Sequence, residues 1–138
     1  MSAFITQLKV RFGDVDPAGI VYYPKIYDYI HEAFEELWDE HVGARYYHLL
    51  LERKVGFPLV HSEVDFRNPL RFGDRPLVHV TCTRLGDSSI SLRYRFFVND
   101  VACLTANMTV VCVELPGMKS TPIPEKYRTG FESIMEEA

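Results

Sequence analysis

The 138-residue chain has few cysteines, no basic cluster and no long apolar run. Cys82, Cys103 and Cys112 show no CxxC spacing and lie in strand-like segments, so we expect buried free thiols rather than disulfides or metal ligands. The net charge is −4, and the scattered Lys and Arg residues argue against a nucleic-acid partner. No window reaches the ~18 apolar residues of a membrane span, and "MSAFITQLKV" does not read as a signal peptide. We therefore expect a cytoplasmic protein with no membrane partner.

Common motifs of metal-dependent and serine-dependent hydrolysis are also lacking. The five histidines contain no pair at i, i+4, and the segment HEAFE, which begins at His31, lacks the second histidine of an HExxH site. Ser88 and Ser89 sit in a hairpin-like turn without a GxSxG motif. We expect neither a bound metal nor a serine nucleophile.

The composition that remains is that of one globular domain, which we place over residues 1–138. Hydrophobic residues make up 47% and charged residues 25% of the chain, which is too apolar for disorder. A domain of this length buries roughly two-thirds of its unfolded surface. One substantial hydrophobic core is therefore expected.

Hydrophobic periodicity predicts an α+β fold. Alternation of apolar and polar residues predicts strands over 5–12, 59–66, 76–85, 90–98 and 101–115. Apolar residues at steps of three and four predict one long amphipathic helix from about Tyr22 or Tyr23 to Gly43, and a shorter helix is expected over 44–54. This order favours an antiparallel sheet that packs one face on the long helix.

The segment FGDVDPAGIVYYP, which begins at Phe12, places an acid just before the long helix. Asp16 could simply cap the helix, but Gly19 and the β-branched residues after it are poor first-turn residues, so the helix should begin near Tyr22 or Tyr23. Asp16 would then face free N–H groups at the positive end of the helix across a small gap. A carboxylate opposite such donors supplies what ester or thioester cleavage needs: a nucleophile or base, and an oxyanion site. Asp14, in an ordinary turn pair, is expected to be structural.

The longer segment FGDVDPAGIVYYPKIYDYIHEAFEELW strongly resembles the opening of the hotdog-fold acyl-CoA thioesterases. The match is to the 4-hydroxybenzoyl-CoA thioesterase group, whose motif is an acid followed by Pro-Ala-Gly-Ile/Val-Val-aromatic-Tyr. The resemblance extends more weakly over almost the whole chain, through FPLVHSEVDFRNPLRFGDRPLVHVT. It implies a five-stranded antiparallel sheet wrapped around the long helix. It also implies homodimers joined edge to edge, often paired into homotetramers, with two active sites per dimer at the subunit interface.

The resemblance also implies roles for individual residues. The catalytic carboxylate of the family falls on Asp16, and the amide that polarises the thioester carbonyl falls on the backbone N–H of Tyr23. Gly19 matches the small residue that lets the acyl thioester approach the backbone. Coenzyme A belongs to the substrate, so no separate cofactor is expected. Asp16 would either attack the carbonyl to form an anhydride or activate water, and the sequence leaves both routes open.

Substrate recognition is expected at four residues in all: Gly19, Tyr22, His31 and His61. In the family, an acid on the long helix reads a ring hydroxyl, and His31 occupies that position here. Tyr22 is expected to line the pocket. His61 lies on an otherwise apolar strand, so we expect a hydrogen-bonded core or pocket residue that is a candidate for substrate contact.

Two alternatives stay open at this point. A non-catalytic acyl-thioester binding protein could use the same scaffold, because a fold alone does not fix function, although an intact acid at Asp16 argues against it. A hotdog dehydratase acting on hydroxyacyl thioesters would need a histidine and an acid in the site, which His31 and Glu32 could supply.

Overall fold

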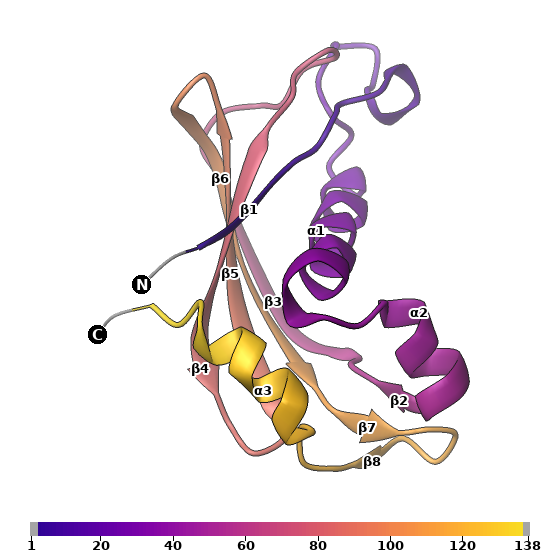
Figure 1. Ribbon diagram of the computed structural model, residues 1–138. Helices are drawn as coiled ribbons and strands as arrows, with labels where there is room; N and C mark the ends of the chain where they lie inside the picture. Colours follow the sequence, from indigo (N-terminus) through magenta and orange to yellow (C-terminus); the bar gives the residue numbers. More distant parts are fainter. Residues whose placement is uncertain (1–2, 137–138) are drawn as a thin grey trace.

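A five-stranded antiparallel sheet dominates the computed structural model, which describes residues 3–136. The strand order is β1-β4-β5-β6-β3, with bounds β1 Phe4–Gln7, β3 Leu59–Phe66, β4 Leu77–Leu85, β5 Ser89–Val98 and β6 Val101–Val111. The long helix α1 (Lys25–Leu37) lies against one face of the curved sheet (Figure 1). The α+β hotdog fold expected from the sequence is confirmed.

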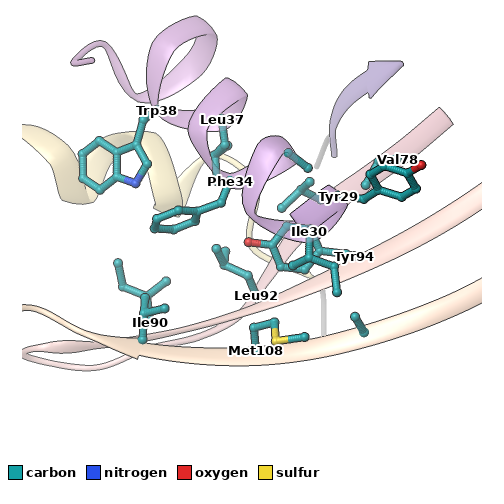
Figure 2. Packing of buried hydrophobic residues seen from close by; sticks show 14 of the residues in the cluster. Tyr29, Ile30, Phe34, Leu37, Trp38, Val78, Ile90, Leu92, Tyr94 and Met108 are labelled. Carbon is teal, nitrogen blue, oxygen red and sulfur yellow. The ribbon is translucent and has the colours of Figure 1, made fainter. Parts of the chain in front are cut away.

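The core forms between the apolar stripe of α1 and the inward face of the sheet. Every member of the two facing sets is at most 5% exposed: Ile26, Ile30, Phe34 and Leu37 on α1, and Ile90, Leu92, Tyr94 and Phe96 on β5. Figure 2 shows these layers meeting, with Trp38 beyond the end of the stripe. Truncating one such aliphatic side chain to alanine typically costs about 2–5 kcal/mol. This packing fixes how α1, and hence the loop before it, sits on the sheet.

The segment after α1 is helical, as expected, but it contains π-helical turns that were not predicted. A π-helical turn, η2 (Trp38–Val42), ends at Gly43, whose φ of 99° is a left-handed conformation that suits glycine. The expected shorter helix appears as α2 (Tyr46–His48) and a second π-helical turn, η3 (Leu49–Arg53).

The first and last predicted strands are both shorter in the structure. Beyond β1 the chain stays extended, with Leu8 N–H donating to Pro76 O at 3.0 Å, but Pro76 has no N–H with which to return the bond. The turn η1 (Phe12–Asp14) follows. At the other end, β6 stops at Val111, and the chain continues as β7.

A small second sheet was not predicted from the sequence. It has the order β2-β7-β8, and each strand has two residues: β2 Val55–Gly56, β7 Val113–Glu114 and β8 Lys119–Ser120. It lies next to α2, at the end of the molecule away from the loop that precedes α1 (Figure 1).

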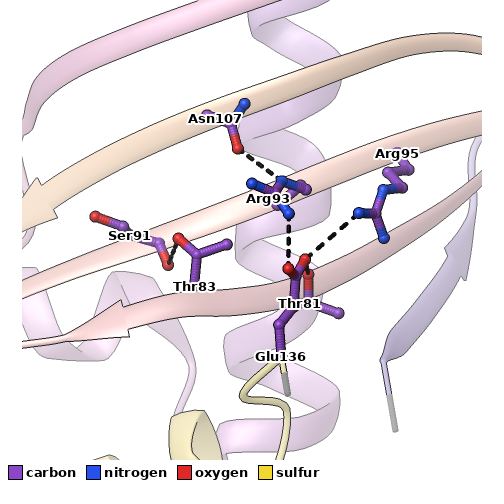
Figure 3. Close-up of polar contacts among 7 residues, drawn as sticks. All are labelled: Thr81, Thr83, Ser91, Arg93, Arg95, Asn107 and Glu136. Atoms are coloured by element: carbon purple, nitrogen blue, oxygen red, sulfur yellow. Dashed lines mark hydrogen bonds and ion pairs between the residues drawn. The ribbon is translucent and has the colours of Figure 1, made fainter. Parts of the chain in front are cut away.

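The C-terminal segment adds a helix that the sequence analysis did not predict, α3 (Glu125–Glu132). After α3 the backbone joins β4 at its bulge, where Cys82 N–H donates to Ile134 O and Glu136 N–H donates to Cys82 O, both at 2.8 Å. The Glu136 carboxylate accepts bonds from Thr81 and Arg93, both at 2.6 Å, on the sheet face opposite α1 (Figure 3). Backbone and side-chain hydrogen bonds therefore both attach the segment after α3 to the sheet.

The three cysteines are buried free thiols, as expected. Burial raises the pKa of Cys82 and of Cys112 to about 11, so both thiols stay protonated near neutral pH. Within residues 3–136, no helix combines the length and apolar character that a membrane crossing requires.

Candidate active site

The acid-bearing segment folds into a tight loop closed by backbone hydrogen bonds. Val15 and Val21 form an antiparallel bridge, and inside it Asp16 N–H donates to Ile20 O at 2.9 Å. Gly19 N–H donates to Asp16 O at 2.8 Å, and the Gly19 φ of 82° is one that L side chains rarely adopt. A Cβ built at Gly19 would have no described atom within 4 Å. Glycine is therefore required for the backbone angle, and the outer side of the loop stays open.

Asp16 keeps half of its carboxylate free. Its Oδ1 accepts the Ala18 N–H at 2.8 Å, which orients the side chain from within its own turn. No other hydrogen bond or ion pair reaches this carboxylate within the part of the chain that the structure describes. Asp16 as a whole is partly exposed.

Asp14 is structural, as expected, and ties the loop to α1. Its carboxylate accepts the hydroxyl of buried Tyr29 at 2.7 Å, and its backbone carbonyl accepts the Tyr22 N–H at 2.9 Å. Burial, followed by the hydrogen bond to Asp14, raises the pKa of Tyr29, so the phenol remains the donor. The loop and the first turn of α1 are therefore held as one unit.

The start of α1 leaves one backbone donor unused. Regular helix begins at Lys25, slightly later than predicted, after a turn in which Lys25 N–H donates to Tyr22 O at 2.8 Å and Ile26 N–H donates to Tyr23 O at 3.1 Å. Among residues 3–136, no acceptor is found for the Tyr23 N–H. This N–H lies at the positive end of a 13-residue helix, where an oxyanion is stabilised.

An apolar pocket of about 420 Å³ includes Tyr23 in its wall. Its wall includes Ile20, Tyr23, Ile26, Phe66, Leu70 and Leu104. The side chains of Tyr22 and Tyr23 are 50% and 69% exposed, so neither is part of the core. Tyr22 and Gly19 lie in the same loop as Asp16 and Tyr23. The other two residues predicted to bind substrate, His31 and His61, lie elsewhere.

His31 lies in a second pocket, of about 270 Å³, between α1, the inner face of β5 and β6, and the start of β3. Its Nε2 is 2.9 Å from Glu35 Oε2, one helical turn further on, and its ring lies 6.1 Å from the Tyr46 ring, centre to centre. The two pockets share no lining residue. His31 pairs with Glu35 and not with Glu32, so the couple on which the dehydratase alternative depended is not formed in the chain.

His61 is exposed on β3, so the expectation of a core position is wrong. The neighbouring Ser62 lies 3.2 Å from Tyr27 on α1, Oγ to hydroxyl, so His61 points to the opposite face of the sheet. Substrate contact by His61 stays a prediction.

The sequence analysis did not identify three residues around the His31 pocket, which are Glu35, Tyr46 and Tyr94. Glu35 could have been found from its i, i+4 spacing to His31. Tyr46 and Tyr94 carry no such signal, because a tyrosine in a helix or on an inward strand position usually only packs.

Comparisons with known proteins agree with the fold. The Thioesterase-like superfamily model matches residues 10–131. The 1,4-dihydroxy-2-naphthoyl-CoA hydrolase of Synechococcus elongatus is 32% identical over 129 residues, covering 93% of this chain and 94% of that protein. The solved structure of a thioesterase superfamily protein from Jannaschia sp. CCS1 has a TM-score of 0.91 and 34% identity, covering 99% of this chain and 95% of that one. A gentisyl-coenzyme A thioesterase structure has a TM-score of 0.84 and 30% identity, covering 93% and 99%.

The chain therefore belongs to the thioesterase-like superfamily. The expectation that it is an enzyme, a thioester hydrolase, is confirmed.

Proposed function

We propose that this thioesterase hydrolyses the CoA thioester of a hydroxylated aromatic acid, with Asp16 as nucleophile or general base and the Tyr23 N–H as oxyanion donor. One observation carries the proposal. The loop that ends at α1 presents a carboxylate with one free oxygen together with a backbone N–H that has no acceptor among the described residues.

The chemistry follows from these two groups. The Tyr23 N–H would donate to the thioester carbonyl oxygen and stabilise the negative charge that develops on it. Asp16 would either attack the carbonyl carbon, giving an acyl anhydride and CoA thiolate, or take a proton from an attacking water. Hydrolysis of the anhydride, or collapse of the water adduct, yields the same acid and CoA.

A second copy of the chain would complete the site. Strand β3 is a free edge of the sheet, and Leu59, Val60 and Phe66 on it are each at least 50% exposed. Antiparallel pairing of β3 with its own copy places the Leu59 end of one strand beside the Phe66 end of the other. Leu59 lines the His31 pocket and Phe66 lines the Tyr23 pocket, so each Tyr23 would meet the His31 pocket of the partner. The smallest active form would be a homodimer, which could pair further into a homotetramer.

The substrate class is supported by relatives and by the pocket. The names of the Synechococcus hydrolase and the gentisyl-coenzyme A thioesterase both describe hydroxylated aromatic acyl groups. The wall of the His31 pocket contains several aromatic side chains, among them Phe34, Tyr46 and Phe57. Aromatic faces and edges are well suited to hold a flat ring.

Thiol release from a panel of acyl-CoAs tests the proposal. The panel contains hydroxylated aromatic, unsubstituted aromatic, short, branched and long-chain acyl groups. We expect the highest kcat/KM for a hydroxylated aromatic thioester. Faster hydrolysis of an aliphatic thioester than of every aromatic one would contradict the substrate class, and no hydrolysis of any member would contradict the activity itself.

A further inference from the structure

Tyr94 is a buried residue whose hydroxyl has no hydrogen-bond partner among the described residues. It projects from β5 toward α1 (Figure 2), and its side chain is only 1% exposed. Across residues 3–136, its hydroxyl makes no hydrogen bond, and only Trp38 Nε1 is a fully buried side-chain polar atom without a partner, so the Tyr94 oxygen retains some solvent contact. Tyr94 forms part of the wall of the His31 pocket.

Tyr46 supplies a second hydroxyl to the same wall. Its oxygen accepts the Phe57 N–H at 3.1 Å, but its own proton has no acceptor in the described part of the chain. Burial raises the pKa of both Tyr46 and Tyr94, so both phenols keep their protons across the range in which an enzyme works. The wall of the pocket therefore carries two hydroxyl groups that can each donate a hydrogen bond to a ligand.

His31 complements these donors. When its Nε2–H donates to Glu35, a neutral imidazole keeps a lone pair on Nδ1 and can accept a hydrogen bond from a hydroxyl. The rest of the wall is largely apolar, with Ile30, Phe34, Met108 and Val110 among its members. The pocket thus matches a flat apolar group that carries hydroxyl substituents.

We propose that Tyr94 and Tyr46 are specificity-determining residues, which donate hydrogen bonds to a ring hydroxyl of an aromatic acyl group bound in the His31 pocket. The inference rests on the proposed function, because it assigns this pocket to the acyl part of the substrate. It adds that hydroxyl substitution of the ring is selected by two tyrosines from α2 and β5, in addition to the histidine on α1.

The test compares 2,5-dihydroxybenzoyl-CoA with benzoyl-CoA in the full-length protein. Tyr94→Phe and Tyr46→Phe each remove one hydroxyl and keep the ring. Tyr127→Phe is the matched control, since Tyr127 is also buried but lies outside this pocket. The readout is the ratio of kcat/KM for the two thioesters, with the melting temperature measured for every variant.

We expect the wild type to prefer the dihydroxylated ring, and each pocket variant to lower that preference by roughly tenfold or more, as the loss of a hydrogen-bonding group in a specificity site does. The control should keep the wild-type ratio. A wild-type preference that survives both pocket substitutions overturns this inference and leaves the proposed function standing. A wild type that shows no preference for the dihydroxylated ring overturns both this inference and the proposed hydroxylated substrate.

Discussion

The hydroxyl of Tyr29 donates to the carboxylate of Asp14 at 2.7 Å, and so joins the middle of α1 to the loop that carries Asp16. Two acids one residue apart therefore have different environments. The Asp14 carboxylate accepts a hydrogen bond from buried Tyr29, whereas the Asp16 carboxylate accepts one only through Oδ1, from the Ala18 N–H in the same turn. This division explains how a short polar segment can be rigid and still present a free carboxylate.

Asp16→Asn should separate chemistry from structure. The amide oxygen can still accept the Ala18 N–H, and Asn suits such turns as well as Asp does, so the melting temperature should stay unchanged. Turnover should fall by about a thousandfold or more, because the nucleophile or base is lost. A variant that loses stability and keeps its rate would show that Asp16 is structural.

Tyr29→Phe should have the opposite effect, lowering stability much more than turnover. It removes the donor to a partly buried carboxylate, and a hydrogen bond to a charged group contributes about 1.5–3 kcal/mol. Urea unfolding should show a loss of this size, with turnover lowered much less than in Asp16→Asn. Asp14→Asn alone and combined with Tyr29→Phe completes a double-mutant cycle, and additive losses would mean that the two side chains do not interact.

Val60→Lys should prevent pairing at the β3 edge. Val60 is 60% exposed, and a lysine there opposes edge-to-edge association. Light scattering should give at least twice the chain mass of 16.0 kDa for the wild type and a smaller mass for the variant, which should also lose activity. Val101→Lys, at a 50% exposed position on β6, should remain a dimer. A wild-type mass near one chain at micromolar concentration would rule out a shared site.

His31→Ala should change the ranking of acyl groups more than the rate on the best minimal substrate. The imidazole lines the pocket proposed to hold the acyl ring, and it takes no part in the proposed bond-breaking step, which uses Asp16 and the Tyr23 N–H. Glu35→Gln should produce a weaker change in the same direction, because Glu35 orients the ring. Equal losses over the whole acyl panel would indicate that His31 only packs.

Glu136→Gln should destabilise the fold by about 1–2 kcal/mol, since the charged acceptor of Arg93 and Thr81 is replaced by a neutral one. Part of this effect should disappear at high salt, because the group is 23% exposed. Thermal unfolding of Glu136→Gln is compared with that of Glu132→Gln, an exposed position on α3, which should change stability by less than about 0.5 kcal/mol.

The helices and strands whose apolar residues recur at one constant spacing were predictable from the sequence. Strand β3 was placed over 59–66, its observed bounds, and the alternation of Ile90 to Phe96 marks the inward face of β5. The two-residue strands of the second sheet are too short to show a period. Helix α3 does carry a signal, since Tyr127, Phe131 and Ile134 are buried at helical spacing, but no prediction was made there.

The site was predictable only where a motif marks it. Asp16 and Tyr23 were located by the motif, and the structure brings them into one loop, but their roles stay predictions. His61 was misplaced because a β-bulge between Leu59 and His61 and an exposed edge make the face of a strand residue hard to assign. Tyr94 fits the alternation of a core residue, and only the three-dimensional arrangement reveals that it lines the His31 pocket and that its hydroxyl has no partner among residues 3–136.

The free edge of β3 has a practical consequence for anyone who measures this enzyme. A site divided between two copies exists only while they are associated, so the rate per mole of protein should fall once an assay is diluted below the dissociation constant of the pair. Each chain would still hold its own Asp16 loop and its own aromatic pocket. Specific activity that stays constant on dilution would therefore demand an exceptionally tight pair, and a decline would report how strongly the two edges hold together.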